Sequence, residues 1–143
     1  MLLSKIESAI AQRLKPLERE NLKVIVFPDD PKELKLPAFN RIIVRYLSES
    51  LTPPQTFNPH APCYQQRFLE FQVFIQYQDL RAKKGLGVTD LMDQIRDRLT
   101  FFKPVPDGKW LYQSSGGFSE LFQDFWAYTM NFTLPYPYTK QPE

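Results

Sequence analysis

One histidine and one cysteine stand close together in the sequence. The spacing of His60 and Cys63 is that of half a zinc site, because zinc is commonly held by two such pairs of ligands. The chain has one residue of each type, so the pair supplies at most two of the four ligands. A cysteine nucleophile beside a histidine base is the other chemistry on offer, but a proline-rich stretch does not hold such a pair rigidly. We therefore expect neither a metal site nor a catalytic pair here.

Three aspartates form the clearest group of carboxylates in the sequence. Asp90, Asp93 and Asp97 are spaced to lie near one another on a helix surface, where their carboxylates could be ligands of a Mg²⁺ ion. Acidic residues early in a helix also stabilise its dipole and keep a face solvated, and we favour this interpretation. The glycine-bearing turns at 85–87 and 114–117 match neither common phosphate-binding motif. The sequence thus predicts no enzyme and no cofactor.

A short basic cluster is the strongest electrostatic feature. Arg81, Lys83 and Lys84 stand together ahead of two glycines. At a loop tip they would meet phosphate groups or an acidic partner surface. The alternative is that they are ordinary solubilising charges beside a turn, as short charge runs usually are.

Composition limits the class of protein. The 143 residues suit one domain, 1–143, and the net charge of +2 does not by itself indicate a nucleic-acid or membrane partner. Aromatic residues make up 15% of the chain and prolines number 13, which predicts flat side chains in a core or interface and stiff connections. One cysteine fits a reducing cytosol, and no apolar run approaches the roughly 20 residues of a membrane span. We expect a soluble cytosolic protein with no membrane partner.

The stretch YQQRFLEFQVFIQYQDL predicts the strand that organises the fold. Its apolar residues Phe71, Val73, Ile75 and Tyr77 alternate with mostly amide side chains, as in a strand with one face in the core. A strand over 65–78 would be roughly 46 Å long, against roughly 37 Å for the diameter of a compact domain of this size. Such a strand either bends sharply or projects, and a projecting strand presents unpaired backbone to a neighbour.

Periodicity and the positions of proline and glycine predict the other elements. They are a helix over 3–14, strands over 22–27 and 41–47, a helix from Thr89 or Asp90 to about 102, a short strand over 110–113, a turn over 114–117, a helical turn or bulge over 118–122, and a last strand over 124–134. Apolar residues on both sides of 22–27 indicate that this strand lies inside the sheet. The predicted fold class is α+β, in the order α-β-β-β-α-β-β, with an antiparallel sheet of four to five strands and two helices packed on one face.

Two proline-rich stretches are predicted to be irregular. The stretch 48–63 contains four prolines and reads as a long loop, which is a type of segment that often serves function or assembly. Phe57 in its middle either packs back onto its own domain or anchors into a neighbouring subunit. The stretch 135–143 reads as an extended tail.

The combined pattern has a family resemblance. A short amphipathic helix leads to two strands, then to a long strand ending near QYQDL, the helix TDLMDQIRDRL and the aromatic strand WAYTMNFTL. In this order and pattern, nearly the whole chain resembles the tail-terminator or tail-completion proteins of long-tailed phages, in particular the Mu-like minor tail family. The same fold is similar to the tube-capping proteins of contractile injection systems. The resemblance implies a structural protein that forms a six-membered ring, caps the tail tube, ends its growth and offers a surface to the connector or sheath.

The resemblance also implies where the contacts lie. A ring needs two different complementary patches on each subunit, and we assign them to the outer half of the 65–78 strand, the 79–88 turn and the 48–63 loop. The assigned interface residues are Phe57, Phe74, Gln76, Gln78, Arg81, Lys83 and Lys84. In a phage-type cap the last three would line the central channel, with transient contact to DNA or cargo.

Three other functions stay open from the sequence. A small enzyme would need a deep pocket with convergent polar groups of perturbed pKa. A monomeric adaptor would bind a peptide along an exposed sheet edge. A head-to-tail connector or neck protein would differ from a tail cap in the end of the particle to which it binds.

Overall fold

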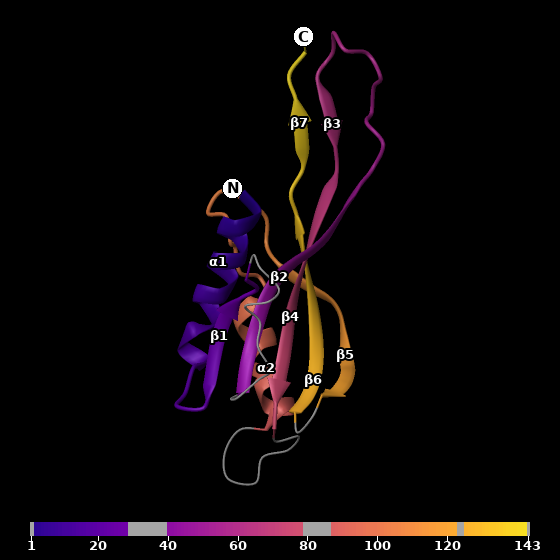
Figure 1. Cartoon of the computed structure of the whole chain (residues 1–143). Coiled ribbons are helices and arrows are strands. Elements are labelled where there is room, and N and C mark those ends of the chain that lie inside the picture. The colour runs from indigo at the N-terminus through magenta and orange to yellow at the C-terminus, as the bar shows by residue number, and fades with distance from the viewer. Residues whose placement is uncertain (1, 29–39, 79–86, 123–124, 143) are drawn as a thin grey trace.

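The computed structural model shows a five-stranded sheet with two helices, and a narrow pair of strands that projects from one end (Figure 1). The structure describes residues 2–28, 40–78, 87–122 and 125–142. The elements in chain order are α1 (Leu2–Leu14), the short 3-10 helix η1 (Lys15–Leu17), β1 (Leu22–Val26), β2 (Asn40–Leu51), β3 (Cys63–Gln65), β4 (Arg67–Tyr77), α2 (Val88–Leu99), β5 (Tyr112–Phe122), β6 (Phe125–Pro135) and β7 (Tyr138–Lys140).

The main sheet has the strand order β1-β2-β4-β6-β5, and β3 pairs with β7 in a separate ribbon. Strands β1 and β2 run parallel, and the other neighbouring pairs are antiparallel. The prediction of an α+β fold with two helices is confirmed. The sheet is mixed where a purely antiparallel one was expected, and the predicted long strand is divided into β3 and β4.

Strand β1 lies at an edge of the sheet, so the expectation that residues 22–27 lie inside it is wrong. Its apolar residues have two different neighbours. Leu22 and Val24 are buried in the core that α1 and η1 help to form, and Ile25 is half-buried on the other face. The pattern showed burial on both faces, which an edge strand also has when a helix covers one face and side chains cover the other.

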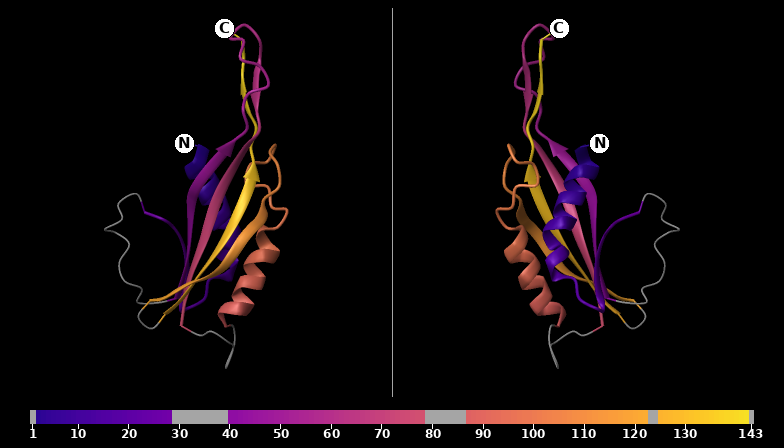
Figure 2. Two further views of the ribbon diagram at one scale, coloured as in Figure 1. Left: turned by 90° about the vertical axis from the view of Figure 1, so that its right-hand side faces the viewer. Right: turned by 90° about the vertical axis from the view of Figure 1, so that its left-hand side faces the viewer.

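Both helices lie on the same face of the sheet, as expected (Figure 2). The amphipathic pattern determines which residues face inward. Helix α1 buries Ile6, Ile10 and Leu14, and α2 buries Leu91, Ile95 and Leu99. These side chains pack on the inward residues of the sheet, which include Val24, Ile42, Val44, Phe71, Val73, Ile75, Met130, Phe132 and Leu134.

Helix α2 begins earlier and ends earlier than the sequence indicated. Its N-cap is Gly87, so the expectation that Thr89 or Asp90 caps it is wrong. The fully buried Val88 belongs to the first turn, and the core contact of that turn extends the helix beyond the polar residues. The helix ends at Leu99, so Phe102 lies beyond the helix and still packs against the core.

Strand β4 is the centre of the sheet. The predicted inward residues Phe71, Val73, Ile75 and Tyr77 are buried, which confirms the assignment of faces. Residues 67–76 pair with β2 and 68–77 pair with β6, so the backbone of β4 is paired on both sides. Its neighbours are as long as β4 itself and satisfy it on both sides. The chain does run on past the body as β3, after an interruption at Gln66.

Strand β5 continues through 114–117, so the prediction of a turn there is wrong. It also continues through 118–122, where the alternative of a bulge is confirmed. The register shifts between Gln113 and Ser115 and again between Phe118 and Glu120, so two bulges take up the irregular residues. A side chain at Gly116 would place its Cβ 3.0 Å from the Thr129 carbonyl oxygen. Glycine is therefore needed for close approach to β6 and does not mark a chain reversal.

The outer edge of β1 is closed by side chains of the preceding helix and turn. The Val24 N–H donates to Glu18 Oε2 at 2.9 Å, and the Val24 carbonyl oxygen accepts from Lys15 Nζ at 2.8 Å. Lys15 and Glu18 also form an ion pair at 3.5 Å. The hydrogen bond from Val24 lowers the pKa of Glu18 below its ordinary value of 4.5, and the charge of Lys15 lowers it further against the opposing effect of burial. This edge is thus protected from pairing with another strand.

Glu18→Gln should lower the free energy of unfolding by about 1 kcal/mol at pH 7, because the charged acceptor of the Val24 N–H is lost from a partly exposed site. The folded-state pKa of Glu18 lies below its unfolded value. Its contribution is therefore fully present above about pH 4.5 and is lost as the pH falls through the lower folded value. Urea unfolding of both proteins between pH 7 and pH 3 measures the difference, which should shrink at the acid end.

The matched control is Glu20→Gln, an exposed carboxylate two residues further on, which should change stability by less than about 0.5 kcal/mol. An equal loss in both variants, or a loss in Glu18→Gln that is unchanged at pH 3, would contradict a role of the Glu18 carboxylate at this edge.

Candidate assembly surfaces

A slender arm extends the sheet beyond the body of the domain (Figures 1 and 2). We define the arm as residues 52–66 and 136–142, which include β3 and β7. Residues 48–51 belong to β2, so the predicted loop over 48–63 begins later than expected. Within the predicted extended tail 135–143, Tyr138–Lys140 form the strand β7, which pairs with β3. The prolines fall between these short paired segments, so they do not prevent pairing.

The side chains of the arm are all exposed or half-buried, so the arm has no hydrophobic core of its own. Hydrogen bonds hold it together. The Thr52 N–H donates to the Gln66 carbonyl at 2.9 Å, and the Gln66 N–H donates to Thr52 Oγ1 at 3.0 Å. At the base, Arg67 Nε donates to the Tyr136 carbonyl at 3.0 Å and the guanidinium lies 5.1 Å from the centre of that ring. A ribbon of this kind is only marginally stable in water alone.

The tip of the arm carries no charged side chain of the Asp, Glu, Lys or Arg type. Residues 52–62 read TPPQTFNPHAP, with four prolines. The Phe57 side chain is 85% exposed, so it does not pack back onto its own domain. His60 is exposed and Cys63 is half-buried in β3. A partner of this tip would meet rings and backbone, and its contact would not depend on ion pairs.

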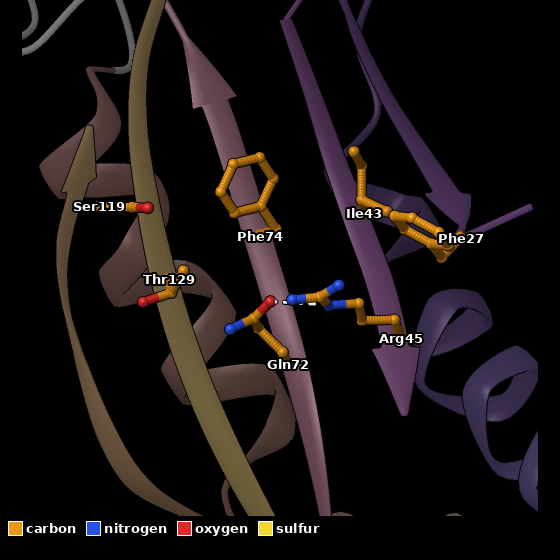
Figure 3. A pocket seen from close by; sticks show the side chains of 7 residues that line it. All are labelled: Phe27, Ile43, Arg45, Gln72, Phe74, Ser119 and Thr129. Atoms are coloured by element: carbon orange, nitrogen blue, oxygen red, sulfur yellow. Dashed lines mark hydrogen bonds between the residues drawn. The ribbon is translucent and has the colours of Figure 1, made fainter. Parts of the chain in front are cut away.

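The face of the sheet opposite the helices has a shallow hollow of about 200 Å³ (Figure 3). Its apolar part comes from Phe27, Ile43 and Phe74, and its polar part from Arg45, Gln72, Ser119 and Thr129. Phe74, one of the predicted interface residues, therefore lies on this face and is half-buried. The hollow combines a ring-lined floor with one guanidinium group.

A row of polar side chains crosses the same face from strand to strand. Arg45 Nε on β2 donates to Gln72 Oε1 on β4 at 2.8 Å, as drawn in Figure 3. Gln72 Nε2 donates to Asn131 Oδ1 on β6 at 3.4 Å, and Asn131 Nδ2 donates to Ser115 Oγ on β5 at 2.9 Å. The Arg45 guanidinium also lies 5.5 Å from the centre of the Phe27 ring. These contacts fix the position of Arg45 beside the hollow.

The remaining predicted interface residues lie in different surroundings. Gln76 is buried and its Oε1 accepts a hydrogen bond from Arg41 Nε, and burial lowers the pKa of the Arg41 guanidinium. Gln78 has an exposed side chain, and its backbone N–H donates to Asn40 Oδ1 at 3.0 Å. Burial also raises the pKa of Tyr46, and the charge of Glu49 adds to this effect. The basic cluster Arg81, Lys83 and Lys84 lies outside the described residues.

The carboxylates that suggested a magnesium site are exposed on α2. Asp93 forms an ion pair with Arg96 at 2.8 Å, one turn along the same helix. Within the described residues, no group of three or more His, Cys, Asp or Glu side chains is placed to hold a metal ion. Among the helices of the same residues, none is long and apolar enough to cross a membrane.

Sequence reasoning missed two groups of exposed aromatic side chains. Phe118 is 56% exposed and packs edge-on against Trp126 and Tyr128. Phe101 and Trp110 lie at the two ends of the connection between α2 and β5, and their ring centres are 5.6 Å apart. No sequence signal indicated the second pair, because Phe101 lay inside the predicted helix and its position after the helix end is seen only in the structure.

Comparison with known proteins identifies the family of the chain. No curated protein matches the chain. The model of the family described as Gp37 protein matches residues 10–143, which is nearly the whole chain. The chain therefore belongs to the Gp37 protein family and is a phage-related protein.

Proposed function

We propose that this protein is a structural tail component that forms a ring, caps the end of a phage tail tube, ends tube growth and joins the tube to the next component. Membership of a phage-related family supports the setting. The observation that carries the proposal is the arm, a paired ribbon that leaves the domain with no buried side chain.

The arm favours assembly for a thermodynamic reason. Two short strands without a core gain little free energy from pairing in water, so a partner that covers the arm would supply the missing burial. The exposed Phe57 ring at the tip offers the kind of aromatic anchor that contributes strongly when it fills a pocket. The arm is thus better suited to binding than to stabilising a monomer.

The position of the arm and the protected edge of β1 support a closed assembly. Arm and body are different surfaces, so contact between an arm and the body of the next subunit is heterologous and closes into a ring when the rotation fits. Growth of the sheet through β1 is hindered by the hydrogen bonds of Lys15 and Glu18 to Val24. The protected edge disfavours open-ended strand addition at that side.

The open face offers a second contact for the tube, the sheath or the connector. Arg45 is held by Gln72 and Phe27 at the margin of the hollow whose floor includes Ile43 and Phe74. An apolar side chain next to a carboxylate would complement this arrangement. Arg81, Lys83 and Lys84 remain our proposed channel residues, with transient contact to DNA or cargo.

The proposal predicts rings of about six subunits, which for a chain of 16.9 kDa have a mass of about 100 kDa. Light scattering over a concentration series and negative-stain images of the same fractions measure this state, with and without the tail-tube subunit of the same phage. Added protein should bind at tube ends and shorten the tubes formed.

A protein that stays monomeric and leaves tube length unchanged would overturn the capping function. Exclusive binding to the head connector would assign it to the neck of the particle instead. A stable dimer that does not grow further would indicate an isologous contact and would contradict a ring.

Phe57→Ser should change the free energy of unfolding by less than about 0.5 kcal/mol, because the ring is exposed in the single chain. The same change should raise the concentration for half-maximal ring formation at least tenfold, because an aromatic anchor is lost from the contact. Thermal unfolding and light scattering measure the two effects separately.

Leu47→Ser provides the control, since Leu47 is an exposed apolar residue of the body outside the arm. It should leave ring formation unchanged. Rings that form equally well in wild type and Phe57→Ser would show that the tip is not an assembly contact.

A further inference from the structure

Phe101 has an unusual backbone conformation for a bulky residue. Its φ angle is 64°, and it is the one residue other than glycine with positive φ in the described part of the chain. It directly follows Thr100, the C-cap of α2. Helices commonly end with glycine at this position, because the left-handed conformation is unfavourable for a residue with a Cβ atom. Glycine would serve the stability of the single chain at least as well.

The backbone here is fixed by its neighbours and not by the Phe101 ring. The Phe101 N–H donates to the Leu111 carbonyl at 2.9 Å, and the Leu111 N–H donates to the Phe102 carbonyl at 2.8 Å. Leu111 is fully buried, and Phe102 packs against the core. These contacts require the left-handed turn, but they do not require a side chain at 101.

The Phe101 ring is 70% exposed and lies edge-on to Trp110, which is itself 56% exposed. Lys103 Nζ lies 5.4 Å from the centre of the Trp110 ring. We define Phe101, Lys103 and Trp110 as the Trp110 patch. A strained backbone that presents a largely exposed ring is better explained by a binding role than by packing within one chain.

Two hollows lie at the base of the arm, and the residue next to Trp110 in the sequence lines both of them. Lys109, next to Trp110, lines a hollow of about 450 Å³ with Tyr136 and another of about 280 Å³ with Tyr64. Pro135 and Pro137 line both hollows. In Figure 2 the connection between α2 and β5, coloured orange, lies on the body below the arm. The two hollows share proline side chains, and each has one tyrosine in its lining.

We propose that the Trp110 patch binds the proline-rich arm tip, residues 52–62, of a second copy of this chain. The inference rests on the proposed ring and names the contact that closes it. Extended proline-rich segments bind surfaces of exposed aromatic rings, and the tip combines four prolines with the Phe57 ring and no Asp, Glu, Lys or Arg. The tip points away from the body of its own chain, so this contact joins two copies (Figure 1).

Phe101→Gly tests the patch with two readouts, one for the stability of the single chain and one for assembly of the ring. The melting temperature of the single chain at low concentration should stay equal or rise, because glycine accepts the backbone angle without strain. The concentration for half-maximal ring formation should rise at least tenfold. Phe118→Ser is the control, because Phe118 is as exposed as Trp110 but lies in the other aromatic group. This variant should still form oligomeric rings.

A lower melting temperature in Phe101→Gly would show that the Phe101 side chain stabilises the single chain, and this result would overturn the proposal. Rings that form normally in Phe101→Gly would overturn it while leaving the capping function intact. A variant that forms rings but no longer binds tube ends would assign the patch to the tube. Failure of the wild-type protein to form rings is a separate result, which removes the proposed function first.

Cross-linking tests the pairing of the two surfaces directly. Cys63 is the only cysteine and is replaced by serine in both partners. One partner carries Gln55→Cys in the tip and the other carries Lys103→Cys in the patch. A mixture of the two under mild oxidation should give disulfide-linked pairs that neither partner gives alone, because the two Cα atoms must approach within about 7 Å. Pairs formed by either partner alone, or none in the mixture, would overturn the proposed contact.

Discussion

Strand pairing that continues past the end of the hydrophobic core is the constraint on which the rest of the structure depends. Pairing of β2, β4 and β6 extends as far as Leu51, Arg67 and Pro135 on the respective strands. Strands β3 and β7 then continue outward as a ribbon without buried side chains. Arg67 stands at the junction. Its guanidinium lies over Tyr136, donates to the Tyr136 carbonyl and reaches Glu49 at 3.9 Å. The junction therefore fixes the start of the arm by polar and stacking contacts, where apolar burial is absent.

Within the described residues, both helices cover the same face of the sheet, and the opposite face carries polar side chains. The row Arg45, Gln72, Asn131 and Ser115 pairs polar groups across four strands. Its members satisfy one another, and such a network specifies one register across the strands. The same network leaves apolar side chains such as Phe74 grouped around a small hollow. One arrangement thus both pairs the polar groups of this face and sets the margin of the hollow.

The sequence predicted what depends on local periodicity. Alternation in β4 identified Phe71, Val73 and Ile75 as core residues, and periodicity identified the two helices α1 and α2. It could not predict the partners of a strand, because the alternation of β1 is the same at an edge as in the interior. It predicted the start of β5 but not its continuation, because Ser114 to Gly117 resemble a turn until β6 lies close enough to crowd a Cβ atom at Gly116.

The arm and the Phe101 turn were harder to predict for a different reason. Proline lowers the expectation of pairing, yet β7 lies between prolines and pairs over three residues only. The backbone angle of Phe101 is set by hydrogen bonds that involve Leu111, ten residues further along the chain, and Phe102. The residue preferences of Phe101 itself do not indicate this angle. Candidate sites on both surfaces thus depend on tertiary contacts. The predicted basic cluster at 81–84 lies outside the described residues, so its contribution stays a prediction.

The chemistry of the arm tip is consistent with assembly on contact with a partner. Burial of a charged side chain is unfavourable unless a partner compensates it, and the tip has none of the Asp, Glu, Lys or Arg type. Its four prolines restrict the backbone before binding, so less conformational entropy is lost when the tip becomes ordered on a surface. An exposed ring such as Phe57 then adds apolar area without a large loss of side-chain freedom. A stiff tip with an exposed ring and no Asp, Glu, Lys or Arg is therefore suited to a contact that depends little on ionic strength.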